Sequence, residues 1–376
     1  MLEIVDEEVC VAWLQQGPSR RPAAFRAVDL RMLDGFTHGE FGDCLFLSCV
    51  LTPLQAGYLT EHGATVIRDD EARPYTAHRS RLYTPEELFA GFDPEQTNGY
   101  DCTFDALVYA HWLRTGGQYP PSISESLARR LHDHSISEAL HDTLHGARAV
   151  AVMGGHNVAR AHAEYRRVAE LSRSLTRAGN VMLSGGGPGA MEATHLGAWF
   201  ASFPNDELEI ALSILAPRPP GASGGEYADP DWLHRAYRVR MRWPQSADHY
   251  ASVGVPTWAY GHEPPAAFAT HIAKYFANSV REDGLLAVAT HGVVFTPGSA
   301  GTVQEIFQDA TQNHYGSFGP PSPMILLGRH YWTTTLPVWA LLERLAERHD
   351  YRDLIVLTDD LDEVVEVLAG YSRPNQ

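Results

Sequence analysis

The chain has 376 residues, of which 44% are hydrophobic and 20% are charged. These proportions are typical of globular proteins and exclude a disordered or fibrous chain, and at this length two or three domains are expected. The 46 acidic and 29 basic residues give a formal net charge of −17, which argues against a nucleic-acid polymer or an anionic membrane surface as a partner. A small anionic ligand remains compatible with this charge, because a pocket can be locally positive.

The N-terminal sequence MLEIVDEEVC is acidic and lacks the basic and apolar segments of a signal peptide. The apolar runs, such as residues 287–289 and 293–295, are far shorter than the ~20 residues that a membrane-spanning helix needs. We therefore expect a cytoplasmic protein with no membrane partner. Four cysteines are too few for a disulfide framework in a chain of this length, and Cys44 and Cys49 are expected to be small buried side chains on a strand.

Residues 1–145 are expected to form an N-terminal α/β accessory domain, in which no motif carries a recognisable catalytic signature. The expected strands are residues 43–51 and 64–67. The expected helices are residues 54–61, a helix that begins at Thr84 and Pro85, residues 104–114 and residues 124–144. Glycines and prolines at 116–121 separate the last two helices.

Residues 146–376 alternate between strand and helix patterns. The expected strands are 149–153, 181–183, 208–214, 292–295, 324–327 and 354–357. The expected helices are 159–178, 190–201, 266–280, 282–291, 302–311, 336–347 and 361–369, and residues 217–231 are expected to form a loop. Repeated β-α units predict a Rossmann-like, doubly wound parallel sheet with helices on both faces.

Three glycine-containing turns follow expected strands of this second part, at residues 153–156, 184–189 and 297–302. Ligands of doubly wound sheets bind outside the carboxyl ends of the strands. Glycine lets the backbone approach a ligand closely, and a following helix N-terminus presents free N–H groups and a partial positive charge. One such turn can be merely a tight turn, but three favour a phosphate-bearing ligand. The predicted binding residues are Gly154, Gly155, Ser184, Gly185, Gly186, Gly187, Gly189, Gly298, Ser299, Ala300, Gly301 and Thr302.

Two common phosphate-binding motifs do not describe these turns. A Walker A loop is excluded because no Gly-Lys-Ser/Thr follows the glycines. Residues 185–189 also lack the G-x-G-x-x-G register of a dinucleotide fingerprint, and the acidic residue expected ~20 positions later falls near Asp206 or Glu207, in a polar segment. A nicotinamide-dependent dehydrogenase is therefore disfavoured.

SGGGPGAMEA at residues 184–193, followed by PGSAGTVQE at residues 297–305, resembles the lysine-decarboxylase-like Rossmann family. The hallmark of that family is PGGxGTxxE after an earlier GGGxxGxM, and the resemblance covers residues 147–376. Its characterised members are the LONELY GUY cytokinin-activating phosphoribohydrolases and bacterial nucleotide 5′-monophosphate nucleosidases. The resemblance implies hydrolysis of the N-glycosidic bond of a nucleoside 5′-monophosphate, giving a free base and ribose 5-phosphate without a cofactor. Pyridoxal phosphate is not indicated, because Lys274, the only lysine, lies in none of the turns.

The resemblance also implies individual roles. Glu305 matches the terminal glutamate of the motif, where a carboxylate would stabilise a ribosyl cation and activate the attacking water. The family arginine that precedes the PGGxGT strand falls in register with Glu282, so a one-residue indel is assumed that places Arg281 there, to bind the phosphate or the base. Met191 and Glu192 match the end of the glycine motif, and Glu192 resembles an acid that contacts ribose or orients the arginine.

Each of these assignments has a structural alternative. Glu305 could simply complement the dipole of the helix that it begins, and Arg281 could be a surface arginine. His271 and Lys274 are alternative cations for the ligand. Ser299 replaces the second glycine of the family motif; it keeps an N–H donor and adds a hydroxyl, but it restricts φ.

A basic stretch at residues 234–242 stands out in so acidic a chain. It is expected to be a strand that places Arg238, Arg240 and Arg242 on one face, either as a rim that binds anions, as a subunit boundary or as a solvent-exposed surface. Nearby aromatic side chains could stack on a base or pack in the core; these are Trp243, Trp258, Tyr260 and His262. The histidines show no metal-binding spacing, so no metal is predicted.

A non-catalytic nucleotide-binding sensor or carrier is the second functional hypothesis, since the same turns could hold a nucleotide without turnover. The resemblance further implies a homodimer or a higher homo-oligomer. It does not specify which base is preferred.

Overall fold

The computed structural model describes residues 2–17, 21–68, 73–95, 99–216, 226–245 and 250–373. The chain forms two compact units: Met1–Arg81 with Ala110–Ala139, and Leu82–Tyr109 with Leu140–Gln376. Leu82–Tyr109, which the sequence analysis placed in the accessory domain, is thus part of the larger unit. Across the described segments, no helix is both long enough and apolar enough to cross a membrane.

The smaller unit contains a four-stranded parallel sheet in the order β1-β2-β3-β4, formed by Leu2–Ile4, Ala23–Arg26, Leu45–Leu47 and Thr65–Ile67. Its helices α1 (Glu7–Leu14) and α2 (Pro53–Glu61) accompany a core rich in aromatic side chains, among them Trp13, Phe25 and Phe46. The expected strand at 64–67 and helix at 54–61 are confirmed, and only the centre of 43–51 is a strand. Three- and four-residue strands such as β1 and β2 are too short to show an alternating pattern in the sequence.

Two longer helices follow, α4 (Phe104–Arg114) and α5 (Ile123–Thr143), close to their expected bounds. In the smaller unit, the buried carboxylate of Glu125 on α5 is paired with Arg129 at 2.8 Å and with Arg73 at 3.1 Å, and it lies 3.1 Å from His111 Nε2. The expected helix start at Thr84 is also confirmed: Thr84 caps the short helix α3 (Pro85–Leu88) through a capping box.

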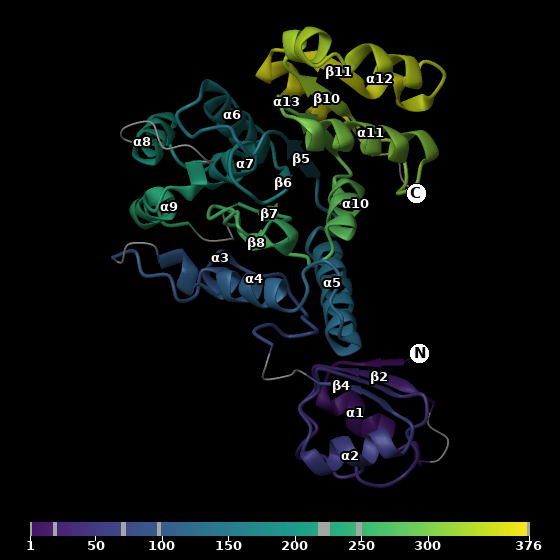
Figure 1. Ribbon diagram of the computed structural model, residues 1–376. Coiled ribbons are helices and arrows are strands. Elements are labelled where there is room, and N and C mark those ends of the chain that lie inside the picture. The colour runs from purple at the N-terminus through teal and green to yellow at the C-terminus, as the bar shows by residue number, and fades with distance from the viewer. Residues whose placement is uncertain are drawn as a thin grey trace. The chain divides into compact units, whose positions relative to one another are not determined.

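The larger unit contains a seven-stranded parallel sheet in the order β11-β10-β9-β5-β6-β7-β8 (Figure 1). Its strands are β5 (Ala149–Met153), β6 (Val181–Ser184), β7 (Ser252–Gly254), β8 (His271–Ile272), β9 (Gly292–Phe295), β10 (Met324–Leu327) and β11 (Ile355–Thr358). From β5 the chain adds strands on one side as far as β8 and then returns to the other side with β9. The strand order therefore reverses between β5 and β9, which is where doubly wound sheets bind ligands.

Helices cover both faces of this sheet, as the sequence predicts. They are α6 (Ala163–Arg177), α7 (Ala190–Trp199), α8 (Asn205–Leu215), α9 (Asp231–Arg242), α10 (Asn278–Val288), α11 (Ala300–Tyr315), α12 (Trp339–Ala346) and α13 (Leu361–Gly370). Helix α6 packs against α7 and α13, whereas α11 packs against α10 and α12. Alternate strand residues such as Val150, Val152 and Met182 join side chains of α6 and α7 in the main hydrophobic core.

Two elements of this unit differ from their prediction. Residues 208–214, expected as a strand, belong to helix α8, whose buried Leu208, Ala211, Leu212 and Leu215 follow the helical period. Residues 266–280, expected as a helix, contain strand β8 and the start of α10. Residues 264–269 and 272–277 are buried without a break, so the apolar run has no periodicity that distinguishes a helix from buried extended chain.

The basic stretch is a third correction, because residues 234–242 lie in helix α9 and not in a strand. The expected single face of Arg238, Arg240 and Arg242 is therefore not formed. Arg240 pairs with Glu86 and lies 4.9 Å from the ring of Trp199. Of the expected loop at 217–231, residues 217–225 lie outside the described residues, Glu226–Ala228 form a 3₁₀ turn, and α9 begins at Asp231.

Candidate functional site

A cavity of about 430 Å³ opens at the carboxyl ends of the central strands of the larger unit. Its volume lies within the range of small-molecule sites. All three glycine turns contribute to its wall, together with the segments after β7 and at the start of α10. The residues lining it are Gly154, Gly155, His156, Gly185, Gly187, Met191, Pro256, Thr257, Tyr260, Glu263, Arg281, Glu282, Ser299, Ala300, Gly301, Thr302, Gln304 and Glu305.

The first two turns are glycine-rich because the backbone passes very close to other atoms. A Cβ at Gly154 would lie 2.1 Å from Thr296 Oγ1, and one at Gly185 would lie 2.1 Å from Arg281 Nη2. Gly186 and Gly189 have φ angles of +71° and +70°, which residues with side chains rarely adopt. The turns thus place backbone, without side-chain bulk, at the cavity wall.

The glycine requirement can be tested on the protein without a ligand. Gly189→Ala would place a methyl group 2.4 Å from the carbonyl oxygen of Gly155 at a positive φ, so we expect the free energy of unfolding to fall by about 1–3 kcal/mol. Gly301→Ala is the matched control, because its Cβ would meet no atom within 4 Å and alanine favours the helix that begins there. Denaturant unfolding of both variants should separate them; equal stability would contradict the account.

The third turn leads into α11, and Ser299, Ala300, Gly301 and Thr302 all line the cavity. Ser299 precedes the helix but makes no side-chain capping bond. The first N–H groups of α11 therefore lie at the cavity wall, and the partial positive charge of the helix N-terminus favours an anion there.

Arg281 and Glu305 meet in this cavity, as the resemblance implies. Arg281 comes from α10 and Glu305 from the second turn of α11, and Arg281 Nη1 lies 3.9 Å from Glu305 Oε1. Arg281 is fixed by the backbone: its Nε donates to the carbonyl oxygen of Val255 at 2.7 Å, and its Nη2 donates to that of Gly185 at 3.3 Å. The guanidinium is thus held against the second glycine turn.

Glu305 has an unusual protonation equilibrium for a glutamate. Burial raises its pKa, Arg281 lowers it, and the neighbouring Glu282 raises it again, so that the pKa is about 7. Near neutral pH this carboxyl group can both accept and release a proton, which is the property that a general acid or base needs. Strongly shifted groups in a cleft are candidates for catalysis.

Five of the residues that the sequence predicts to bind the ligand do not line the cavity. They are Ser184, Gly186, Gly189, Glu192 and Gly298. Ser184, Gly186 and Gly189 instead shape the backbone of the second turn. The Ser184 hydroxyl donates to the carbonyl oxygen of Met191 at 3.1 Å and accepts from the Gly186 N–H at 3.1 Å. At Gly298 a Cβ would lie 2.1 Å from Thr302 Oγ1, so this glycine allows α11 to begin where it does.

Glu192 is buried in an ion pair behind the turn. Its carboxylate accepts from Arg160 Nε at 2.8 Å and from the Tyr165 hydroxyl at 2.8 Å. Arg160 in turn lies 4.1 Å from the ring centroid of Trp232. Glu192 thus orients an arginine, but that arginine is Arg160 and not Arg281.

Several cavity residues were not predicted from the sequence. His156, Thr257 and Gln304 are polar, and Glu263 and Glu282 add carboxylates to that of Glu305. Adjacency to a glycine motif could have indicated His156 and Gln304, whereas no local pattern indicates Thr257 or Glu263. No group of three His, Cys, Asp or Glu side chains suited to a metal ion occurs within the described ranges.

The aromatic and cationic alternatives occupy different places. Trp243 and Trp258 are buried, whereas Tyr260 lines the cavity and is half exposed. His262 is exposed, and neither His271 nor Lys274 lines the cavity. Lys274 is fully buried and lies 2.6 Å from Asp105 Oδ1, so it is unsuited to meet a ligand.

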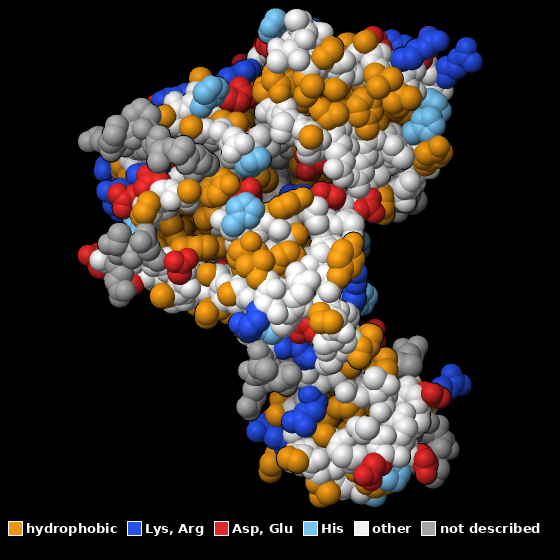
Figure 2. Space-filling model, in the orientation of Figure 1, with side chains coloured by type: hydrophobic (Ala, Val, Ile, Leu, Met, Phe, Trp, Pro, Cys, Tyr) orange, Lys and Arg blue, Asp and Glu red, His pale blue; other side chains and the backbone are white. Residues whose placement is uncertain are grey.

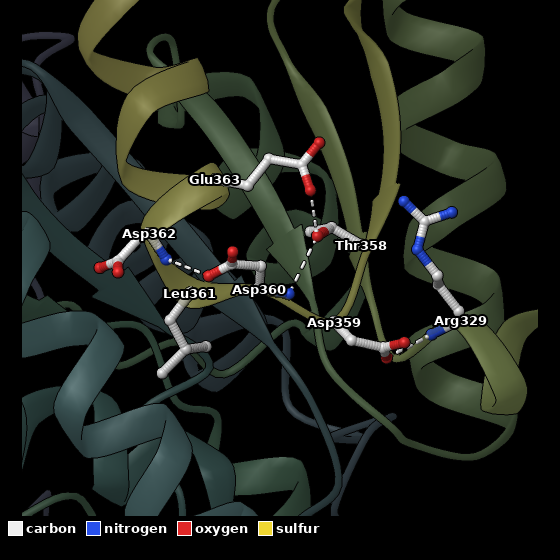
Figure 3. A pocket seen from close by; sticks show the side chains of 7 residues that line it. All are labelled: Arg329, Thr358, Asp359, Asp360, Leu361, Asp362 and Glu363. Carbon is white, nitrogen blue, oxygen red and sulfur yellow. Dashed lines mark hydrogen bonds between the residues drawn. The ribbon is translucent and has the colours of Figure 1, made fainter.

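A second, more open pocket of about 720 Å³ lies at the carboxyl end of β11 (Figure 3). Three of its four acidic side chains are engaged in local hydrogen bonds. Asp360 accepts from the Asp362 N–H at 2.9 Å, Asp359 accepts from the Arg329 N–H at 2.8 Å, and Glu363 accepts from the Thr358 hydroxyl. The Asp360 contact caps the start of α13, so this acidic cluster has a structural role.

The exterior is mixed in character. Acidic and basic side chains are interspersed on the face shown in Figure 2, and hydrophobic side chains gather near α12, where Leu341 and Leu345 are exposed.

Neither a protein-family model nor a curated protein matches the sequence. Among solved structures, the chain is similar to the molybdenum cofactor binding protein from the phototrophic bacterium Rippkaea orientalis, with 13% sequence identity and a TM-score of 0.36. That similarity covers 58% of this chain and 94% of the other. A similarity at this level has no bearing on function.

Proposed function

We propose that the chain hydrolyses the N-glycosidic bond of a nucleoside 5′-monophosphate, giving a free base and ribose 5-phosphate. The observation that carries the proposal is the pairing of Arg281 with Glu305 in a cavity walled by three glycine turns. Arg281, Glu305 and the second and third of these turns resemble the phosphoribohydrolase motifs. A mononucleotide fits the 430 Å³ of the cavity, whereas a polymer does not.

The chemistry follows from where the groups lie. The phosphate accepts hydrogen bonds from backbone N–H groups of the third glycine turn, where α11 begins, and these hold the anion without many side-chain cations. As the C1′–N bond breaks, positive charge develops on the ribosyl group, and the Glu305 carboxylate stabilises it. Water then forms the new C1′–O bond as the C1′–N bond breaks. Glu305 takes one proton of the water and gives it to the departing base, which regenerates the carboxylate. Arg281 orients the Glu305 carboxylate and offsets its negative charge.

The pKa of Glu305 makes the pH dependence diagnostic. Because the ionised carboxylate is the form that activates water, kcat/KM should fall about tenfold per pH unit below a pKa of about 7 and level off above it. Initial rates of base release between pH 5 and 9 test this. A profile with its midpoint near the ordinary glutamate pKa of ~4.3 would contradict the assigned role.

A panel of nucleotides tests the function itself. Purified full-length protein is incubated with AMP, CMP, GMP, UMP, IMP and a cytokinin riboside monophosphate, and free base is measured by chromatography alongside thermal-shift binding. Release of base from at least one nucleotide is expected. Binding without release would favour the sensor or carrier, for which the engagement of Arg281 by two backbone carbonyls is the favourable observation.

Assembly and location are parts of the proposal that rest on the sequence. The homodimer follows from the family resemblance, and a cytoplasmic location is proposed with it. Light scattering on the purified chain measures the first directly.

A further inference from the structure

Glu263 is a cavity residue that the proposed function has not used. It follows the 3₁₀ turn Trp258–Tyr260, and its N–H donates to the Tyr260 carbonyl oxygen at 2.9 Å. Pro264 and Pro265, both buried, come directly after it and restrict the backbone. Its carboxylate lies beside the second glycine turn: a Cβ on Gly187 would be 3.2 Å from Glu263 Oε2.

The carboxylate of Glu263 faces the cavity without a protein partner. No hydrogen bond or ion pair joins its side chain to any other residue in the described part of the chain. The nearby cations are engaged elsewhere, Arg281 with Glu305 and Lys274 with Asp105. A carboxylate left in this state is available to accept hydrogen bonds from a ligand.

The charges in the cavity orient a nucleotide within it. Glu263, which has no partner among the described residues, would repel a phosphate placed beside Gly187. The first turn of α11 begins with Ala300, Gly301 and Thr302 and offers backbone N–H groups and a hydroxyl. The two carboxylates near that turn are engaged, Glu305 with Arg281 and Glu282 with Gln304 Nε2 at 3.1 Å. The phosphate therefore belongs at α11. The sugar then lies near Glu305, one turn along the same helix, and the base points toward Gly187, Met191 and Glu263.

That end of the cavity suits a flat base. The Met191 side chain lies along the glycine turn, with its Cε 3.0 Å from where a Cβ on Gly187 would be, and the half-exposed ring of Tyr260 also lines the wall. Thioether and aromatic groups provide apolar contact for the faces of a base. Glu263 is thus placed to meet its edge.

A carboxylate can distinguish the bases by the hydrogen-bond donors and acceptors on their edges. It has two acceptor oxygens and no donor, so it binds best to two adjacent N–H donors. Guanine presents this pair at N1 and N2. Adenine and cytosine place a ring-nitrogen acceptor beside the amino group, uracil flanks its single donor with two carbonyl groups, and hypoxanthine lacks the amino group.

We propose that Glu263 selects the base, and that the site prefers guanosine 5′-monophosphate by accepting hydrogen bonds from guanine N1–H and N2–H. This inference rests on the proposed function for the placement of the nucleotide. It adds a specificity-determining residue that lies outside both sequence motifs. Glu263 takes no part in bond cleavage.

The test compares Glu263→Gln with the native chain and with the matched control Glu343→Gln, whose half-exposed side chain lies on α12 away from the cavity. For each protein, kcat/KM for base release and the thermal shift are measured with GMP, IMP and AMP. The native chain and the control should favour GMP over IMP by about 10- to 100-fold, the effect of one hydrogen bond to a charged group. The glutamine side chain carries one donor and one acceptor, which match adenine, so Glu263→Gln should reverse the preference toward AMP.

The outcomes separate the two proposals. If base is released but the GMP-to-AMP ratio is the same in Glu263→Gln and native protein, the role of Glu263 is wrong and the hydrolase stands. If nucleotides bind without release and the binding preference reverses, the hydrolase is wrong and the role of Glu263 stands. If no nucleotide binds or reacts, both are overturned.

Discussion

Glu305→Gln is expected to reduce kcat for base release by about 10²- to 10⁴-fold, the usual contribution of a positioned acid-base group. The amide has nearly the same shape as the carboxyl group, but it cannot take a proton from water and carries no negative charge to stabilise the ribosyl cation. Nucleotide binding should persist, because in the proposed pose the phosphate is held by the backbone N–H groups at the start of α11 and not by Glu305. Initial-rate measurements and binding titrations on the same preparation test both statements.

The stability of this variant provides an internal check. Because burial raises the pKa of Glu305, the folded state holds its proton more tightly than the unfolded state, and ionisation costs stability as the pH rises through about 7. Glu305→Gln removes this cost and should unfold at the same temperature as the native protein or a higher one at pH 8. Glu343→Gln should change neither activity nor melting temperature. A Glu305→Gln protein that is folded and retains more than about a tenth of the native rate would contradict the catalytic role.

Lys274→Met is expected to lower the free energy of unfolding by about 3–5 kcal/mol, the cost of breaking a buried ion pair from one side. Lys274 Nζ lies 2.6 Å from Asp105 Oδ1, and both side chains are fully buried. Burial lowers the pKa of Lys274, and the adjacent Asp105 opposes that effect. Methionine fills the space of the lysine stem but leaves the aspartate charge without its counter-ion. Chemical denaturation of the full chain measures the loss.

A double variant shows whether the uncompensated charge is the cause. Asp105 also accepts from the Tyr100 hydroxyl at 2.7 Å and from Trp258 Nε1 at 2.9 Å. An uncharged asparagine can keep both contacts: its carbonyl oxygen accepts from Trp258 Nε1, and its amide nitrogen donates to the Tyr100 hydroxyl oxygen. Lys274→Met combined with Asp105→Asn should therefore be more stable than Lys274→Met alone. If the double variant is the less stable one, the loss comes from packing and not from the charge.

The ion pair between Lys274 and Asp105 explains how Leu82–Tyr109, a segment distant in sequence, supports the cavity. Asp105 begins α4 in Leu82–Tyr109, and Trp258 precedes the cavity residues Tyr260 and Glu263. A Cβ on Gly261 would lie 2.3 Å from the ring of Tyr109, so the turn packs closely against α4. The Lys274–Asp105–Trp258 cluster thus fixes the wall that carries Tyr260 and Glu263.

The sheet and its glycine turns could be predicted because their signals are local. The buried strand Ala149–Met153 is a short apolar run next to a glycine turn, and α11 follows a Pro-Gly turn. The parallel order around β5 and β9 then brought the first and third turns to one cavity. Arg281 and Glu305 could be placed there once the motif register was assumed.

The remaining parts of the site depend on tertiary contacts. Glu263 reaches the cavity because the segment after β7 folds back along the second turn, where the Ala266 N–H donates to the Gly186 carbonyl oxygen at 2.8 Å. Nothing near Glu263 in the sequence encodes that contact. Glu192 shows the converse: its position beside the glycine motif suggested a ligand contact, but the buried Arg160 holds it behind the turn.

Helix α9 shows how charge can mislead. Alternating arginines at 238, 240 and 242 favoured a strand, although the buried residues Trp232, Arg235, Ala236 and Val239 recur at helical spacing. Arg235 is one of the buried residues because it pairs with Asp229, so a polar residue stood at a core position of the helix.

The hydrolysis of the N-glycosidic bond is tested most directly by identifying both products of one reaction. Native protein and Glu305→Gln are incubated with GMP at pH 8, and free base and ribose 5-phosphate are quantified together by liquid chromatography and mass spectrometry. We expect equal amounts of the two products from the native protein and almost none from the variant. Nucleoside with inorganic phosphate, equal turnover by the two proteins, or no product from any nucleotide of the panel would contradict it.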